Sequence, residues 1–128
     1  MQGLLAIINL PWSIFLLLIS LLSVPTKATV YKNPLALVVN VKSFWYYRWI
    51  SSQKGVRAMA LGNVILLGPK LLPNDLEHEL IHIRQHQREP LVHPLLNQIE
   101  TFRHGYRNNR YEVEAYTTTK STYVGHKL

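Results

Sequence analysis

The sequence contains no cysteine and has few acidic residues. Its 128 residues include 7 Asp and Glu against 14 Lys and Arg, which gives a formal net charge of +7. The absence of cysteine excludes disulfide bonds and Cys-based zinc sites. The basic residues are spread along the chain without a helix-turn-helix or an aromatic RNA-binding signature, so we predict no nucleic-acid partner. An anionic membrane surface, with membrane lipid as the partner, is the simpler explanation of the charge.

Charged side chains are also missing from the N-terminal segment, because no Asp, Glu, Lys or Arg occurs between Gly3 and Val24. A helix of that length spans roughly 33 Å, which is enough for the hydrocarbon core of a bilayer. We therefore predict a transmembrane helix within residues 1–25, which makes the protein single-pass. A cleaved signal peptide and a buried or re-entrant helix are the alternatives. The first lysines all follow this segment, which favours a cytoplasmic domain.

Residues 26–53 are predicted to be a linker followed by a membrane-proximal apolar and aromatic segment. Within it, residues 35–41 are apolar and β-branched, which favours a strand over a helix that extends into the next segment. Five of the six residues 44–49 are aromatic, and they belong either to an interfacial belt or to a core. Residues 54–67 are predicted to be paired strands around a Gly-Asn turn. This hairpin either pairs with an extended substrate or only packs.

The most informative stretch is His78-Glu79-Leu80-Ile81-His82, a His-Glu-x-x-His motif. Residues four apart on a helix lie on one face with Cβ atoms roughly 5–6 Å apart, so both histidines can bind one metal ion. Two neutral imidazoles bind Zn²⁺, while the neighbouring carboxylate stays off the metal and takes a proton from the bound water. The motif therefore predicts Zn²⁺ as the cofactor, His78 and His82 as ligands and Glu79 as the catalytic base.

The local context favours a helix for this motif. Asn74 or Asp75 can cap its start and Pro90 ends it, which predicts a helix from roughly 75 to 89. At about 100° per residue, the two motif histidines share one face with Gln85, and apolar residues lie nearly opposite. Such a helix packs on a core with one side and presents a metal pair on the other.

Two further helices are predicted downstream. Residues 95–103 have helical spacing and an apolar stripe, which helix-to-helix packing would explain. The stripe consists of Leu95, Leu96, Ile99 and Phe102. After a turn at 105–109, a third helix is predicted from residue 110 to about residue 120.

The segment from Asn109 to Tyr116 reads Asn-Arg-Tyr-Glu-Val-Glu-Ala-Tyr and resembles the third-ligand helix of gluzincins, in which a downstream Glu binds zinc. With the His-Glu-x-x-His motif, the resemblance covers roughly residues 55–119. It is to small gluzincin-like metallopeptidases and, more remotely, to the membrane-bound heat-shock and CAAX prenyl proteases. It implies an α+β fold, with a minimal zincin-like domain of a short β-hairpin or sheet and metal-binding helices over residues 54–120, before a tail at 121–128.

Two glutamates compete for the third ligand position that a catalytic zinc site requires. In the membrane-protease pattern the ligand stands three residues before Ala115, which indicates Glu112. In the thermolysin-like pattern it immediately precedes the Ala, which indicates Glu114. The two lie about 200° apart on a helix and cannot both face the metal. We favour Glu112.

Supporting residues remain open at this stage. These families often place an Asp after the Ala to orient a ligand histidine, but Tyr116 occupies that position here. Candidates for this support are Glu77, Gln85 and Tyr116. Candidates for stabilising a developing oxyanion are His104 and the tyrosines at 106, 111 and 116.

The sequence thus predicts a membrane-anchored zinc metallopeptidase that acts on peptide or protein substrates near the membrane. The alternative is a non-catalytic membrane protein that keeps a zincin-like fold as a binding or assembly module. A small membrane-active protein with an accidental motif is a third hypothesis.

Overall fold

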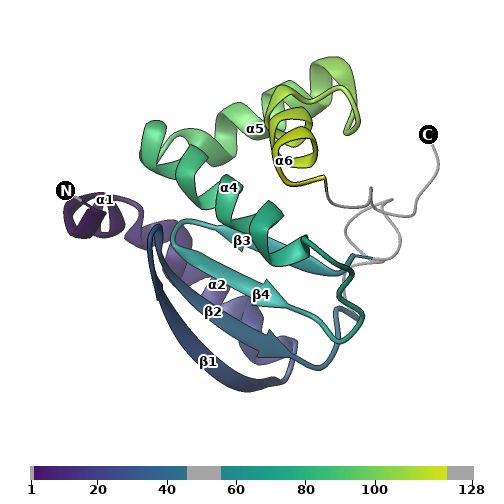
Figure 1. The fold of residues 1–128 in the computed structure, drawn as a ribbon. Helices are drawn as coiled ribbons and strands as arrows, with labels where there is room; N and C mark the ends of the chain where they lie inside the picture. The colour runs from purple at the N-terminus through teal and green to yellow at the C-terminus, as the bar shows by residue number, and fades with distance from the viewer. Residues whose placement is uncertain (1, 46–55, 121–128) are drawn as a thin grey trace.

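The computed structural model describes residues 2–45 and 56–120 and confirms an α+β fold (Figure 1). Within these residues, four strands form one mixed sheet in the order β1-β2-β4-β3, accompanied by five helices. The elements in chain order are α1 Gln2–Ile8, α2 Leu10–Leu22, β1 Pro25–Lys32, β2 Leu35–Val41, β3 Ala58–Leu61, β4 Val64–Leu67, α4 Asp75–Arg88, α5 His93–His104 and α6 Arg110–Thr119. Residues 46–49 of the aromatic segment and the tail 121–128 lie outside the described residues.

The central strands β2 and β4 are covered on both faces, whereas β1 is largely exposed. Side chains alternate between the two faces of each strand. On one face, Leu16 of α2 packs in a core with Val39 and Leu66. On the other face, Ile83 of α4 packs in a second core with Ile65. Helices α5 and α6 lie beyond α4, on the side away from the sheet (Figure 1). The sheet therefore fixes α4, and α4 in turn supports the two C-terminal helices.

The predicted hairpin of β3 and β4 is confirmed, and its turn is in contact with α2. The two strands pair in antiparallel fashion. Gly62 in the turn has a φ of 63°, which glycine adopts without a steric penalty. A Cβ atom at Gly62 would also collide with Ser13 of α2. The Oγ atom of Ser13 accepts a hydrogen bond of 2.9 Å from the backbone N–H of Asn63, so this turn holds α2 on the sheet.

The strand predicted at 35–41 is confirmed as β2, but the linker predicted before it is wrong. β1 occupies most of that stretch and pairs with β2 in antiparallel fashion along its length. Its β-branched residues and a tyrosine favour an extended strand. β2 also pairs in parallel with β4. The segments 26–53 and 54–120 therefore contribute strands to the same sheet.

The N-terminal segment is not the continuous helix that its hydropathy predicts. It is broken into α1 and α2, which are bent by 70° relative to each other, and no single helix among the described residues is long and apolar enough to cross a membrane. The break lies at Asn9, whose side chain is fully buried. The Asn9 amide donates to the carbonyl of His86 (3.3 Å) and accepts from the N–H of Leu91 (2.7 Å). Pro11, in the first turn of α2, favours a helix start there.

The three downstream helices are confirmed, but the apolar stripe of α5 is mostly exposed rather than covered by another described helix. Three of its four residues are exposed, with Phe102 at 92%. The inner face of α5 is polar instead. His93 is buried there, and the side-chain amide of Asn109 donates to Asn97 and to Thr101. Hydrogen bonds from Asn109 therefore join this helix to the start of α6.

The buried Asn9 should contribute strongly to stability. We expect Asn9→Ala to lower the free energy of unfolding by about 2 kcal/mol, because two backbone groups lose their side-chain partner. Urea unfolding followed by circular dichroism measures this change. The matched control is Asn108→Ala at an exposed position, which should change the free energy by less than about 0.5 kcal/mol. Equal effects of the two substitutions would contradict the role given to Asn9.

Candidate metal centre

Contacts at the start of helix α4 and on its core face fix its position beside the sheet. At its start, the guanidinium of Arg57 binds the carboxylate of Asp75 through two hydrogen bonds, of 2.7 and 3.1 Å. Asp75 also accepts a hydrogen bond of 2.8 Å from the N–H of Leu72. Ile83 is fully buried against the sheet. The opposite face of α4 therefore presents its side chains in a defined position.

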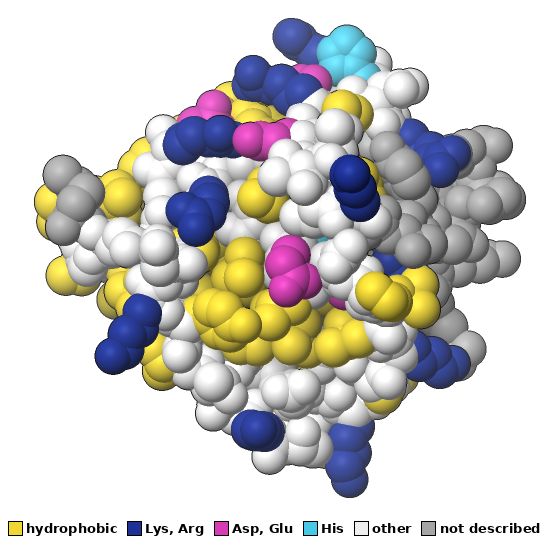
Figure 2. All heavy atoms as spheres, viewed as in Figure 1, with side chains coloured by type: hydrophobic (Ala, Val, Ile, Leu, Met, Phe, Trp, Pro, Cys, Tyr) yellow, Lys and Arg dark blue, Asp and Glu magenta, His cyan; other side chains and the backbone are white. Residues whose placement is uncertain are grey.

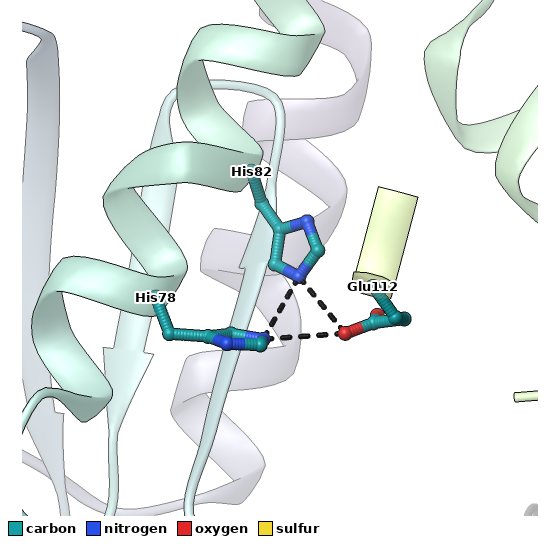
Figure 3. Close-up of side chains that lie close together, drawn as sticks. All are labelled: His78, His82 and Glu112. Carbon is teal, nitrogen blue, oxygen red and sulfur yellow. Dashed lines mark hydrogen bonds and ion pairs between the residues drawn. The ribbon is translucent and has the colours of Figure 1, made fainter. Parts of the chain in front are cut away.

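Two histidines of α4 and one glutamate of α6 converge on one point (Figure 3). The Nε2 atoms of His78 and His82 lie 3.1 Å apart. The Oε1 atom of Glu112 lies 3.2 Å from Nε2 of His78 and 3.3 Å from Nε2 of His82. The three ligand atoms all lie within 4.8 Å of one another, as a metal site requires. A buried His-His-Glu group of this kind could hold a metal ion.

The spacing of these atoms fits a tetrahedral ion. Zinc ligands lie about 2.0–2.1 Å from the metal, so that two ligands of a tetrahedral site are about 3.4 Å apart. The three observed separations are all close to that value. Three protein ligands leave the fourth position of a tetrahedral ion for water or substrate, which is the composition of catalytic rather than structural zinc sites.

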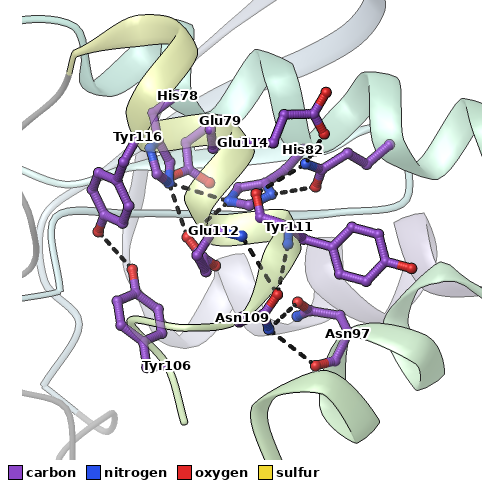
Figure 4. Close-up of polar contacts among 12 residues, drawn as sticks. His78, Glu79, His82, Asn97, Tyr106, Asn109, Tyr111, Glu112, Glu114 and Tyr116 are labelled. Carbon is purple, nitrogen blue, oxygen red and sulfur yellow. Dashed lines mark hydrogen bonds and ion pairs between the residues drawn. The ribbon is translucent and has the colours of Figure 1, made fainter. Parts of the chain in front are cut away.

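Asn109 places Glu112 by capping the start of α6. Its Oδ1 atom accepts hydrogen bonds from the N–H groups of Tyr111 (2.8 Å) and Glu112 (3.4 Å), which are otherwise unpaired at a helix N-terminus. Its side-chain NH₂ group binds α5 (Figure 4). In the sequence, Asn109 stands out as the first residue of the segment that resembles the third-ligand helix, and an Asn just before a helix is also a known capping signal.

The competing glutamate faces away from the three ligand atoms. Glu114 forms an ion pair with Arg88, with an Nη2–Oε1 distance of 2.6 Å, and accepts a hydrogen bond of 2.7 Å from the side-chain NH₂ group of Gln85. Of the two glutamates, only Glu112 contacts the histidines, whereas Glu114 contacts Gln85 and Arg88 (Figure 4).

Gln85 determines which nitrogen of His82 is available to a metal. The NH₂ group of Gln85 donates to the carbonyl of Tyr111 and to Glu114, which can only accept. The Oε1 atom of Gln85 is therefore the atom that lies 2.8 Å from Nδ1 of His82, so that Nδ1 must donate. In the neutral imidazole this leaves the lone pair on Nε2, which points to the candidate site. Gln85 thus takes the supporting position that the sequence left open.

Of the four residues that the sequence offered for stabilising an oxyanion, some lie beside the site and others do not. The ring of Tyr116 packs against that of His78, with centroids 4.3 Å apart, and its hydroxyl lies 2.6 Å from the hydroxyl of Tyr106 (Figure 4). The ring of Tyr111 packs on His93 instead. His104 is the last residue of α5 and its side chain is more than half exposed. It does not line the cleft beside the site, so the structure does not support it as a site residue.

Burial and charge act against each other on the ionisable groups of the site. Burial lowers the pKa of His82, but the charge of Glu112 and its hydrogen bond outweigh burial and raise the pKa to about 10. Burial would raise the pKa of Glu112, yet the charge of His82 and the hydrogen bonds from both histidines hold it well below its usual range. Burial raises the pKa of Glu79, against the opposing charges of the two histidines. Near neutral pH and without metal, His82 is therefore cationic and Glu112 anionic.

The site opens into a cleft with a volume of about 470 Å³. Glu79 and the three ligands line it together with β3, the start of α5, and Trp12 and Phe15 of α2. The Oε2 atom of Glu79 lies 4.0 Å from Nε2 of His78. The contribution of α2 could not be found in the sequence, where Trp12 and Phe15 lie in an apparently continuous apolar segment.

Comparison of the chain with protein-family models, with curated proteins and with solved structures finds no match. The class of protein is thus defined by fold and site alone: an α+β protein with a buried His-His-Glu group at the base of a cleft.

The identity of the third ligand can be tested by metal content. We expect His82→Ala and Glu112→Ala to abolish stoichiometric zinc binding. Glu114→Ala should keep one zinc per chain with an affinity about 10-fold weaker, because it removes a partner of Gln85. Elemental analysis gives the stoichiometry and competition with a chelator gives the affinity. Glu77→Ala, at an exposed position of α4, is the control. Loss of zinc in Glu114→Ala but not in Glu112→Ala would contradict the assignment.

Zinc binding should release protons near neutral pH. Zinc binds the neutral imidazole, but the pKa of His82 is raised to about 10, so the metal must displace about one proton from this residue. The apparent affinity should therefore rise with pH, by about 10-fold per unit, until the pH reaches that pKa. Calorimetric titration in buffers of different ionisation enthalpy counts the protons. A binding heat that is the same in all buffers would contradict the raised pKa.

Proposed function

We propose that the protein is a zinc-dependent metallopeptidase with a minimal zincin-like arrangement. The main support is the convergence of His78, His82 and Glu112 on one point, with the carboxylate of Glu79 beside them in a cleft. This is the set of side chains that the resemblance to gluzincins implies for water-mediated peptide hydrolysis. A zinc ion in such a site supplies a bound water whose pKa is lowered to around 7.

Glu79 is suited to handle the protons of this reaction. It is one residue from His78 on the same helix but is not among the three converging groups. It is buried, and burial raises its pKa. A carboxylate with a raised pKa accepts a proton from the attacking water and returns it to the leaving amine more readily than an exposed one. We assign Glu79 the role of general base and then of proton donor.

Tyr106 is the residue best placed to stabilise a developing oxyanion. It lines the cleft, and its hydroxyl is held by that of Tyr116, which packs on a ligand histidine. A hydroxyl that is already oriented adds stabilisation without reorganising during the reaction. Because His104 is exposed and is not among the residues that line the cleft, we assign this role to Tyr106.

The lining of the cleft favours peptides with apolar side chains. Met59, Leu61 and Leu95 line it beside the aromatic residues of α2, and binding clefts with apolar walls and a few polar groups are typical of sites for small ligands and side chains. β3 also lies along the cleft. Pairing of an extended substrate with this hairpin, as the sequence suggested, stays a prediction.

The role of Glu79 can be separated from metal binding. We expect Glu79→Gln to reduce hydrolysis of an unfolded protein or of a quenched peptide library by at least about 100-fold, with one zinc per chain retained. The matched control is Glu77→Gln, two residues earlier on the exposed side of the same helix, which should keep full activity.

Two results would contradict the proposal. Undiminished cleavage by Glu79→Gln would exclude the mechanism. Stoichiometric zinc in the unsubstituted protein, without cleavage of any substrate in the library, would favour the non-catalytic binding or assembly module instead.

A further inference from the structure

The polar residues of the N-terminal segment face the protein. Between residues 3 and 24 the side chains that can form conventional hydrogen bonds, besides that of Trp12, are those of Asn9, Ser13, Ser20 and Ser23. All four residues are buried, with relative exposures between 0 and 6%. This is the reverse of an ordinary surface helix, which buries its apolar stripe and exposes its polar residues.

Contacts with the rest of the chain account for this orientation. Asn9 binds the end of α4 and the loop that follows it, and Ser13 binds the turn between β3 and β4. The carbonyl of Ser23 accepts hydrogen bonds from the backbone N–H groups of Lys42 (3.0 Å) and Ser43 (3.2 Å). Polar groups along the segment thus attach it to three separate parts of the protein.

The outward face of α1 and α2 is apolar along its whole length. Nine large hydrophobic residues on it are between 38 and 67% exposed: Leu4, Ile7, Ile8, Leu10, Ile14, Phe15, Leu18, Leu21 and Leu22. Hydrophobic side chains project at the end of the molecule formed by α1, on the left of Figure 2. So many exposed apolar side chains along one segment mark a contact surface rather than a face in water.

The end of this face carries basic and aromatic groups. Lys27 and Lys42 are exposed where the chain leaves α2 for the sheet. The indole N–H of Trp45 donates to the carbonyl of Leu22 (2.9 Å), and Trp45 is 54% exposed. Lysines and a tryptophan next to an apolar face are typical of groups at the headgroup level of a bilayer, where the cations bind anionic lipid.

We propose that the outer face of α1 and α2 is a docking surface for a lipid bilayer, with Lys27, Lys42 and Trp45 at the headgroups. A protein partner fits this face less well, because protein interfaces contain about one hydrogen bond per 100–200 Å². The outward side chains of these helices offer almost no donor or acceptor, whereas hydrocarbon requires none. The assignment does not depend on catalytic activity.

The docking surface also determines the side from which a substrate enters the cleft. Trp12 and Phe15 belong to α2 and line the cleft that contains the candidate metal centre. With α2 on the bilayer, the mouth of the cleft lies next to the membrane. If the proposed peptidase activity holds, on which this step rests, the position of the cleft selects apolar peptide segments at the membrane surface as substrates.

The absence of cysteine allows a direct test with single labels on the full chain. Leu18→Cys and the control Leu72→Cys, in the loop before α4, are each labelled with an environment-sensitive fluorophore. Vesicles are made of phosphatidylcholine alone or with phosphatidylglycerol. We expect the label at position 18 to brighten and shift to the blue on vesicle addition, more at low salt with the anionic lipid, and the label at position 72 to stay unchanged.

A second comparison uses unlabelled protein in vesicle flotation. Leu18→Gln with Leu21→Gln should reduce the bound fraction by about 10-fold or more, because two side chains that would be buried in hydrocarbon become polar. The matched control, Leu71→Gln with Leu72→Gln, should float like the unsubstituted protein. Glu79→Gln should also float normally, which separates lipid binding from the peptidase proposal.

Three results would overturn the proposal. The first is that the unsubstituted protein binds neither kind of vesicle. The second is that the variant with Gln at 18 and 21 floats as well as the unsubstituted protein. The third is a dimer in solution in which the label at 18 is already shielded and does not respond to vesicles, which would assign the face to a second copy of the chain.

Discussion

The buried carboxylate of Glu112 is the constraint on which the C-terminal half of the protein depends. A carboxylate removed from water without a partner is costly, and the cost is offset only by close opposite charge and hydrogen bonds. Here two imidazoles supply both, at 3.2 and 3.3 Å. The same contacts raise the pKa of His82 to about 10, which places a proton where the metal would bind. The ion pair therefore keeps the ligands together in the metal-free protein.

Holding that arrangement requires contacts from every neighbouring element. Asn109 fixes the start of α6 and joins it to α5. Gln85, which binds His82 on its own helix, joins α4 to α6 through its hydrogen bond to Glu114. At the other end of α4, Asp75 binds Arg57 at the entry to β3. Because each link is a hydrogen bond between different elements, a shift of one helix would disturb the ligand geometry as a whole.

The elements with strong local signals were predictable, and those that depend on distant contacts were not. The Gly-Asn turn, the helix that ends at Pro90 and the downstream helices follow from short-range patterns. The convergence of His78, His82 and Glu112 was expected from helical spacing and from the resemblance to gluzincins. The bend at Asn9 was not, since its cause lies 77 and 82 residues away. The apolar stripe of α5 was wrongly expected to pack against another helix. The hydrogen bonds that join α5 to α6 lie on its polar face instead.

The N-terminal segment shows why average hydropathy was insufficient. At 100° per residue, the polar positions 9, 13, 20 and 23 fall within an arc of about 80°, so they form a stripe on one side of a helix. An ordinary amphipathic helix has an apolar stripe on a polar background, whereas this segment has a polar stripe on an apolar background. Helices that face protein on one side and hydrocarbon on the other show this second pattern, because polar side chains near lipid turn toward protein partners. The same stripe that attaches α2 to the sheet therefore leaves only apolar side chains to face outward.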